Sequence, residues 1–259
     1  MRKTTLLLLS LTCLALSASA QEFKTKLGNA KDRKVILEMD AGDYKLEGYD
    51  GDELIIRASS GLEAPPERAK GLKPLYYNAV DNSGIGLAVT SESGALKIEK
   101  ATRKDIDYTI RVPKKAALLV RQTNWRGGAI SISNMDGDLE IKTNNAPITL
   151  KSVTGPVVAN TTNGEVNVIY TNLSQEKPSS ITTISGIVDV TLPANAKTSL
   201  KMRSINGEMY TDFDLGLKNS RDGLSKVGGG NNIEGTTNGG GVEIQLNTIS
   251  SNIYIRKQK

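Results

Sequence analysis

The sequence predicts an all-β protein in which short strands stack into a β-solenoid or β-roll. Three observations lead to this fold class. Helical periodicity is hard to find after the N-terminal segment, apolar and polar residues alternate over many short stretches, and glycines precede strand-like segments at regular intervals from residue 129 onward. Alternation with a period of two is the pattern of a strand with one buried face. The alternative is an antiparallel β-sandwich, which hairpin turns between successive strands would distinguish.

The first segment has the pattern of a secretory signal peptide. Two basic residues follow Met1, an apolar run covers residues 6–16, and residues 18–20 form a small-x-small cleavage site. The apolar run is about half the length that a membrane span needs. We therefore expect cleavage after Ala20, no transmembrane segment, and export to the periplasm, the outer envelope or the cell surface. The only cysteine, Cys13, would leave with the leader.

The composition excludes several kinds of active site. The chain has no histidine, so a Ser-His-Asp triad, a Cys-His pair and a His-ligated zinc ion are all excluded. A mature chain without cysteine also lacks disulfides and thiolate metal sites. The chain has a mild net charge of +5, and its basic residues are scattered along the sequence. A nucleic-acid-binding surface typically has clustered basic residues. We expect no cofactor, no metal and no nucleic-acid partner.

The first half of the mature chain predicts hairpins. Half-buried strands are expected where apolar residues alternate, at residues 35–39, 54–56, 87–89, 96–98 and 106–112. Asp50-Gly51 and Ser93-Gly94 lie between strand pairs, and glycine accepts the positive φ that tight hairpin turns need. We interpret residues 21–128 as a hairpin region that caps the stack and residues 59–83 as a surface loop.

A repeated motif begins at residue 129. The second residue after each of five glycines is aliphatic, in the pairs Gly137/Leu139, Gly155/Val157, Gly164/Val166, Gly186/Val188 and Gly207/Met209. The intervals between these glycines are 18, 9, 22 and 21 residues. One strand and one turn take about ten residues, so two such units predict a coil of about twenty. We expect the glycines to lie at corners, where they would adopt left-handed backbone angles.

The end of the chain predicts the closing strands of the stack. Apolar residues alternate in residues 240–246 and 249–257, which we expect to close the second end. Residues 216–241 are rich in glycine and asparagine and predict a surface loop. The expected organisation is a leader over residues 1–20, the cap over 21–128 and the repeat solenoid over 129–259, with 21–259 as one continuous domain. The 25 glycines and 4% aromatic residues suit a narrow interior of small aliphatic side chains.

Four residues are candidates for a ligand site. Glu140 and Asp189 are the third residues after repeat glycines, and on one face they would be the carboxylate pair that glycoside hydrolysis uses. No aromatic platform accompanies them in the sequence, so we interpret them as solvent-facing polar positions. Trp125, the only tryptophan, lies beside Arg126 in a loop ahead of the repeats. An exposed indole there could stack on a sugar or anchor a protein, or it could cover an open first coil.

Several segments carry a family resemblance. The strongest are the strand that ends in Val112-Pro113 and the repeats at Gly137-Asp138 and Gly155-Pro156, supported by residues 44–58 and 253–257. Together they resemble a large bacterial family of exported β-strand-repeat proteins, described as putative adhesins and also classed as a domain of unknown function. The resemblance covers most of the mature chain. It implies a right-handed stacked β-fold, an envelope or surface location and no catalytic residues.

These observations predict an exported, non-catalytic, adhesin-like or envelope structural module. It would bind a surface glycan or an envelope protein through a rigid solenoid face. A polysaccharide-active enzyme that uses outward carboxylates such as Glu140 and Asp189 is the second interpretation. An envelope sensing or regulatory partner is the third.

Overall fold

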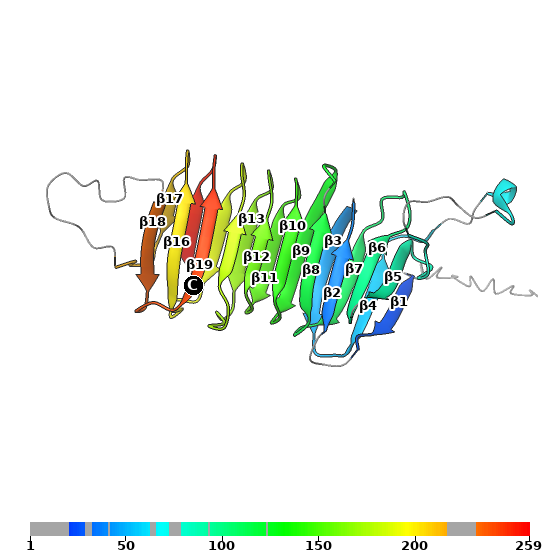
Figure 1. Ribbon diagram of the computed structural model, residues 1–259, viewed down its shortest axis with the longest axis horizontal. Coiled ribbons are helices and arrows are strands. Elements are labelled where there is room, and N and C mark those ends of the chain that lie inside the picture. Colours follow the sequence, from blue (N-terminus) through cyan, green and yellow to red (C-terminus); the bar gives the residue numbers. More distant parts are fainter. Residues whose placement is uncertain are drawn as a thin grey trace, which may run out of the picture.

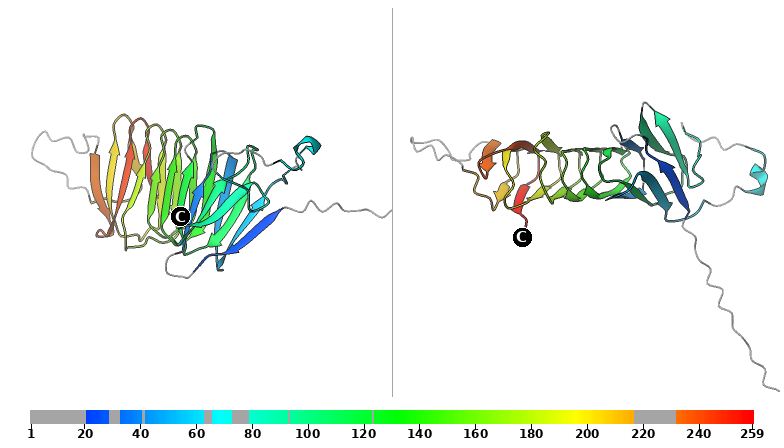
Figure 2. Two further views of the ribbon diagram at one scale, coloured as in Figure 1. Left: turned by 45° about the vertical axis from the view of Figure 1, so that its right-hand side comes forward. Right: turned by 90° about the horizontal axis from the view of Figure 1, so that it is seen from below.

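In the computed structural model the chain forms an elongated stack of two facing β-sheets (Figures 1 and 2). The structure describes residues 21–28, 33–40, 42–62, 66–72, 79–92, 94–122, 124–216 and 232–259. The expected leader and its cleavage site lie outside these residues. Within them the helical structure is the single 3-10 turn η1 (Glu67–Ala69), and no helix is long and apolar enough to cross a membrane.

Each sheet contains ten strands. Sheet A has the order β1 (Glu22–Lys26), β4 (Glu53–Ala58), β7 (Tyr108–Pro113), β3 (Gly42–Tyr49), β9 (Gly127–Met135), β11 (Ile148–Val153), β13 (Val166–Tyr170), β15 (Val188–Leu192), β20 (Ile253–Lys257), β17 (Met209–Thr211). Sheet B has the order β18 (Asn232–Thr237), β16 (Thr198–Ser204), β19 (Val242–Thr248), β14 (Ser179–Thr182), β12 (Val157–Asn160), β10 (Leu139–Thr143), β8 (Ala117–Gln122), β2 (Lys34–Glu38), β6 (Ala95–Lys100), β5 (Leu87–Glu92).

Successive strands of the middle section alternate between the sheets, so each pair of strands makes one coil. Leu139 of β10 pairs with Val157 of β12 in sheet B, and Ile148 of β11 pairs with Val166 of β13 in sheet A. Both ladders are parallel, which confirms the predicted stack of short strands. The antiparallel sandwich is not formed, because antiparallel pairs occur only toward the two ends of the stack.

The core lies between the two sheets. In β13 the side chains of Val166, Val168 and Tyr170 are completely buried, whereas the two residues between them are partly exposed. Full burial of a large aliphatic side chain stabilises the fold by roughly 1.5–3 kcal/mol. The Tyr170 hydroxyl donates a hydrogen bond of 3.2 Å to Ser179 Oγ across the interior, and burial raises the pKa of Tyr170 to about 12.

The repeat glycines have a different role from the one predicted. Their backbones do not adopt positive φ. Instead, a Cβ on Gly164 would lie 2.0 Å from the carbonyl oxygen of Ala146, and one on Gly186 would lie 1.8 Å from that of Gly164. Adjacent coils therefore approach so closely at these corners that only glycine fits.

A column of buried hydroxyls follows the same corner. Thr183 Oγ1 accepts a hydrogen bond of 3.0 Å from Gly186 N, three residues later in its own coil. It also donates one of 3.3 Å to the carbonyl oxygen of Gly164 in the neighbouring coil. Ser204 makes the equivalent pair with Gly207 N and Ser251 O, at 2.8 and 2.9 Å. This hydroxyl column supplies partners for backbone groups that the turns leave outside the strand ladders.

The N-terminal strands join the stack rather than only forming hairpins. Strand β2 lies between β6 and β8, and β3 lies between β7 and β9, all in parallel pairing. In Figure 1 these blue strands lie between the green strands of the middle and the teal strands β6 and β7. Parallel stacking thus extends on both sides of residue 129. The division into a cap over residues 21–128 and a solenoid over residues 129–259 stays a prediction.

The two predicted hairpin turns have different outcomes. The turn that contains Gly94 joins the antiparallel neighbours β5 and β6, and Gly94 has a φ of 81°, although Ser93 lies outside the described residues. The prediction of a hairpin at Asp50-Gly51 was wrong. Strands β3 and β4 on either side of it do not pair, because β7 lies between them and pairs with both.

The C-terminal strands do not close the end of the stack, contrary to the prediction from residues 240–257. Strand β19 lies between β14 and β16, and β20 lies between β15 and β17. In Figure 1 these red strands are flanked by earlier parts of the chain on both sides. The expected loop over 216–241 also contains a strand, β18, which pairs antiparallel with β16. Its only large apolar residue is Ile233, so the alternation there was too weak to indicate a strand.

Candidate functional site

The two candidate carboxylates are on opposite sheets. Glu140 lies on β10 of sheet B, and Asp189 lies on β15 of sheet A. The hydrophobic core separates the two sheets, so these side chains cannot act on the same glycosidic bond. The hypothesis of one face lined by both residues was therefore wrong, because successive strands of a coil belong to different sheets.

Each carboxylate has a basic partner of its own. Lys142 Nζ lies 2.6 Å from Glu140 Oε1, and this hydrogen bond lowers the pKa of Glu140. Arg256 binds Asp189 with two nitrogens, Nε at 2.9 Å from Oδ1 and Nη2 at 2.9 Å from Oδ2. A general acid needs a raised pKa, and the hydrogen bond from Lys142 has the opposite effect on Glu140. Both carboxylates are arranged as charged surface partners.

Trp125 and Arg126 lie in the corner between β8 and β9. The Trp125 side chain is 60% exposed, and its carbonyl oxygen accepts a hydrogen bond of 3.1 Å from Asn145 Nδ2 of the next coil. The Arg126 amide donates to Asn124 Oδ1 at 3.1 Å. Trp125 does not cover an open first coil, because β2 and β3 pair with β8 and β9 and extend the stack beyond them. The structure thus leaves the indole as an exposed side chain at this corner and shows no binding role for it.

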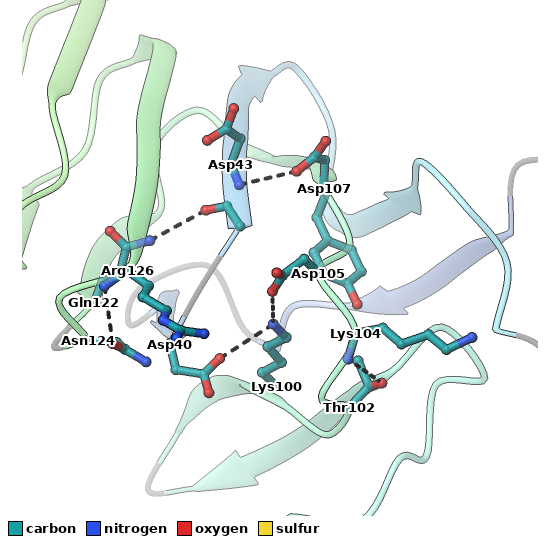
Figure 3. A network of polar contacts seen from close by, with 12 residues as sticks. Asp40, Asp43, Lys100, Thr102, Lys104, Asp105, Asp107, Gln122, Asn124 and Arg126 are labelled. Carbon is teal, nitrogen blue, oxygen red and sulfur yellow. Dashed lines mark hydrogen bonds and ion pairs between the residues drawn. The ribbon is translucent and has the colours of Figure 1, made fainter.

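A polar network lies beside this corner (Figure 3). Lys100, whose side chain is only 5% exposed, has Nζ at 3.6 Å from Asp40 Oδ1 and 3.4 Å from Asp105 Oδ1. Asp107 Oδ1 accepts the amide hydrogen of Asp43 at 3.3 Å. These contacts join the beginning of β3 to the segment before β7, so the network has a structural role. Among the described residues no group of three or more acidic side chains could hold a metal ion.

An open depression of about 490 Å³ adjoins the network on the outer face of sheet A. Asp43, Arg57 and Asp107 contribute to its wall. Asp43 Oδ1 accepts the amide of Ala129 at 2.8 Å, and Arg57 Nε donates to Glu22 Oε2 at 2.6 Å. Because these charged groups already hold neighbouring strands together, we do not assign a ligand to this depression.

The strongest candidate site is a pair of stacked tyrosines on the outer face of sheet A. Tyr210 of β17 and Tyr254 of β20 are in register, and Tyr254 is in turn in register with Asp189 of β15. Their ring centroids are 5.2 Å apart and the ring planes differ by 10°. The guanidinium carbon of Arg256 lies 5.2 Å from the centroid of Tyr254. We call Tyr210, Tyr254 and Arg256 the tyrosine platform.

Hydrogen bonds fix the two rings in place. The Tyr210 hydroxyl donates to the Glu208 carboxylate, and this bond raises the pKa of Tyr210. Asn252 Nδ2 donates to the Tyr254 hydroxyl at 3.1 Å. A ring that is held rigidly loses little conformational entropy when a ligand binds.

A shallow depression of about 220 Å³ accompanies the platform, and Asp212 also lines it. Asp212 Oδ1 accepts the amide hydrogen of Lys257 at 2.8 Å, which joins the end of β20 to the segment after β17. The sequence indicated Asp189 as a candidate but not the aromatic pair beside it. Tyr254 is 44 residues from Tyr210 in the printed sequence, and only the position of β20 between β15 and β17 makes them neighbours.

Comparison with known proteins identifies a family. Residues 10–256 match the family model described as Toastrack DUF4097. No curated protein matches the chain.

Three solved structures are similar to the chain at low identity. A putative cell adhesion protein from Clostridium sporogenes is 11% identical, with a TM-score of 0.43, over 92% of this chain and 100% of that one. A putative adhesin from Bacteroides fragilis is 12% identical, with a TM-score of 0.36, over 93% and 99%. A putative lipid binding protein from Parabacteroides distasonis is 12% identical, with a TM-score of 0.22, over 93% and 98%.

Proposed function

The chain belongs to the Toastrack DUF4097 family, and on that premise we propose that it is an exported, non-catalytic, adhesin-like module. It binds a surface glycan or an envelope protein through an outward face of its stack. The observation that carries this proposal is the tyrosine platform, in which two in-register rings are held 5.2 Å apart on a sheet. Exposed aromatic side chains on a rigid surface are typical of recognition sites.

The rigidity of the stack supports this function. Strands β9, β11, β13, β15 and β20 are joined by continuous parallel ladders, so their outward side chains keep fixed relative positions. A face of this kind offers many weak contacts to an extended ligand, and because the face is already ordered, binding costs little conformational entropy of the protein.

The positions of the carboxylates support the absence of catalysis. A retaining or inverting glycosidase needs two carboxyl groups within about 10 Å across one bond. Here Glu140 and Asp189 are on different sheets, and each is bound to a lysine or an arginine. The second interpretation, a polysaccharide-active enzyme, therefore has less support.

We also propose where the chain resides and how its stack is shaped. The leader pattern at residues 1–20 supports export to the periplasm, outer envelope or cell surface. We propose right-handed coils, because parallel strands joined by a crossover have that hand in about 98% of cases. We also propose that the antiparallel strands β1, β4 and β5 cap the N-terminal end of the stack.

A binding screen tests the proposed function. The mature chain would be applied to an array of bacterial and host-surface glycans, and separately immobilised to capture proteins from an extract of the producing cell's envelope. We expect reproducible, saturable binding in one arm. A folded chain that binds in neither arm would contradict the proposal.

A further inference from the structure

We propose that the tyrosine platform is a binding site for a neutral pyranose ring of a glycan. The inference rests on the proposed function, whose ligand it narrows from a glycan or protein to an uncharged sugar. It is carried by the edge strand β17, where an aromatic side chain lies between two carboxylates.

Among the described residues, the Tyr210 ring has one face that no strand of sheet A covers. One face of this ring stacks on Tyr254, with the planes 10° apart. Sheet A ends at β17, so the opposite face points beyond the last described strand of the sheet, and the side chain is 46% exposed. The ring faces carry partial negative charge and attract the weakly positive C–H groups on the face of a pyranose.

Two acidic side chains lie beside that face of Tyr210. The Glu208 carboxylate accepts the hydrogen bond of the Tyr210 hydroxyl, and Asp212 lines the depression with Tyr210, so both acidic side chains that flank β17 lie on the side of the Tyr210 ring. Both carboxylates are exposed and accept hydrogen bonds only. Sugar hydroxyls are the donors that such acceptors select, and they surround the C–H face of a pyranose. An aromatic face between two acceptors matches this distribution.

Local charge favours a neutral sugar over an acidic one. The guanidinium of Arg256 is bound to both oxygens of Asp189, so its charge is already compensated. Among the described side chains beside the edge, Glu208 and Asp212 then outnumber the one further cation, Lys257, whose amide binds Asp212 and whose Nζ lies 5.2 Å from the Phe213 ring. The resulting negative potential repels uronic acids, sialic acids and phosphate groups. The depression of about 220 Å³ is smaller than the roughly 300–1,000 Å³ of sites for drug-sized ligands, as expected for contact with one sugar ring.

A protein strand added to the edge of sheet A fits less well. Strand β17 has only three residues, Met209–Thr211, and acidic side chains flank it. Short edge strands and charged flanks are the features that prevent strand addition. The few main-chain hydrogen bonds available there would contribute little affinity.

The test uses the mature chain and a panel of named probes. Methyl glucoside, methyl galactoside, methyl mannoside and N-acetylglucosamine are the neutral probes, and glucuronate is the charged one. Calorimetric titration gives the affinities, and saturation-transfer NMR identifies the protons that contact the protein. We expect at least one neutral pyranose to bind, with transfer strongest at its ring C–H protons, and glucuronate to bind more weakly.

Variants locate the site. Tyr210→Ala removes the free face and should weaken binding at least about fivefold, the scale of an aromatic contact. Tyr210→Phe keeps the ring and should stay within about threefold of the wild type. Trp125→Ala removes another exposed aromatic side chain, remote from the platform, and serves as the matched control with unchanged affinity. Thermal melts confirm that each variant is folded, and Tyr254→Ala, which removes the supporting ring, should weaken binding as well.

The outcomes separate this inference from the proposed function. Unchanged affinity in Tyr210→Ala and Tyr254→Ala, or loss in Trp125→Ala, would overturn the platform as the sugar site while the chain remains a glycan binder. Capture of an envelope protein by a wild type that binds no pyranose would overturn the inference and leave the function standing. A folded wild type that binds neither a glycan nor an envelope protein would contradict both the inference and the proposed function.

Discussion

Individual residues of the corner explain how adjacent coils can approach each other closely. The Thr183 hydroxyl accepts a hydrogen bond from the Gly186 amide and donates one to the Gly164 carbonyl oxygen, so one hydroxyl joins two coils. The adjacent glycines leave room for this approach, because a Cβ on Gly186 would be 1.8 Å from a neighbouring carbonyl oxygen. Small side chains and buried hydroxyls at the corners are therefore as important as the aliphatic core.

Replacement of Thr183 by valine tests the hydroxyl column. The two side chains have nearly the same shape, but valine leaves the buried amide of Gly186 and the carbonyl of Gly164 without this partner. We expect the free energy of unfolding to fall by about 1–3 kcal/mol. Thr149→Val, at an outward and partly exposed position of β11, is the control and should change it by less than about 0.5 kcal/mol. Equal effects of the two changes in urea denaturation would contradict the assigned role.

The sequence contains part of this residue-scale information. The recurrence of Gly164, Gly186 and Gly207 predicted corners, and their place in the structure agrees with that. The predicted reason for glycine at these corners, a positive φ, was wrong. The actual reason is the close approach of the next coil, which a single sequence does not show. The hydroxyl three residues before each of these glycines is visible in Thr161, Thr183 and Ser204, and that spacing was the signal that the sequence analysis missed.

At the scale of elements, sheet B carries a ladder of ion pairs across three strands. Lys97 of β6 lies 3.1 Å from Glu38 of β2, and Arg121 of β8 lies 2.8 Å from the same carboxylate. Lys97 also pairs with Glu99 at 2.9 Å. These partly exposed contacts join the inserted strand β2 to both of its neighbours. Arg121 lies directly across the β2–β8 ladder from Glu38, and Lys97 lies diagonally opposite Glu38 and bridges it to Glu99, the residue directly across the β2–β6 ladder.

The ladder predicts a pH dependence of stability. Burial raises the pKa of Glu38, but hydrogen bonds from Lys97 and Arg121 outweigh it and lower the pKa below the ordinary 4.5. A carboxyl group whose pKa is lower in the folded state stabilises the fold above its unfolded pKa, and this contribution is lost as the pH falls through the folded pKa. The difference in unfolding free energy between wild type and Glu38→Gln should thus be largest above about pH 5 and shrink on acidification. A difference that grows toward pH 3 in denaturant titrations would contradict this.

The sequence predicted which segments form strands better than which strands are neighbours. The alternation in residues 35–39, 54–56 and 96–98 correctly indicated β2, β4 and β6. Their neighbours depend on the order of coils in space, and aliphatic strands of similar length fit several positions in a stack. For this reason the platform was not predicted, since Tyr254 and Tyr210 meet only because β20 precedes β17 in the sheet.

For the whole molecule, the distinctive feature is that two coils from near the ends of the chain, β2–β3 and β19–β20, lie inside the stack, whereas β1 lies at an edge of sheet A. The coil of β2 and β3 separates β6 and β7 from β8 and β9, and the coil of β19 and β20 separates β14 and β15 from β16 and β17. Each inserted coil is hydrogen-bonded on two sides. These two inserted coils therefore join the outer coils to the middle of the stack, and the strands that fray first should be edge strands rather than β19 and β20.

Hydrogen exchange tests this arrangement. Amides of β19 and β20 should be protected about as strongly as those of β12 to β15, although they belong to the last residues of the chain. The edge strands β1 and β18 should exchange earlier, because each has a paired neighbour on only one side. Exchange of β19 and β20 before β16 and β17 would show that the C-terminal coil lies outside the stack.

We propose that this rigid stack binds its ligand and leaves it chemically unchanged. The most direct test is to incubate the wild type with a polysaccharide that it retains, and then to measure the mass distribution of the recovered polysaccharide and any new reducing ends. We predict an unchanged mass distribution and no new reducing ends after prolonged incubation. Shortened chains whose formation Glu140→Gln or Asp189→Asn abolishes would contradict the central claim and identify the protein as an enzyme.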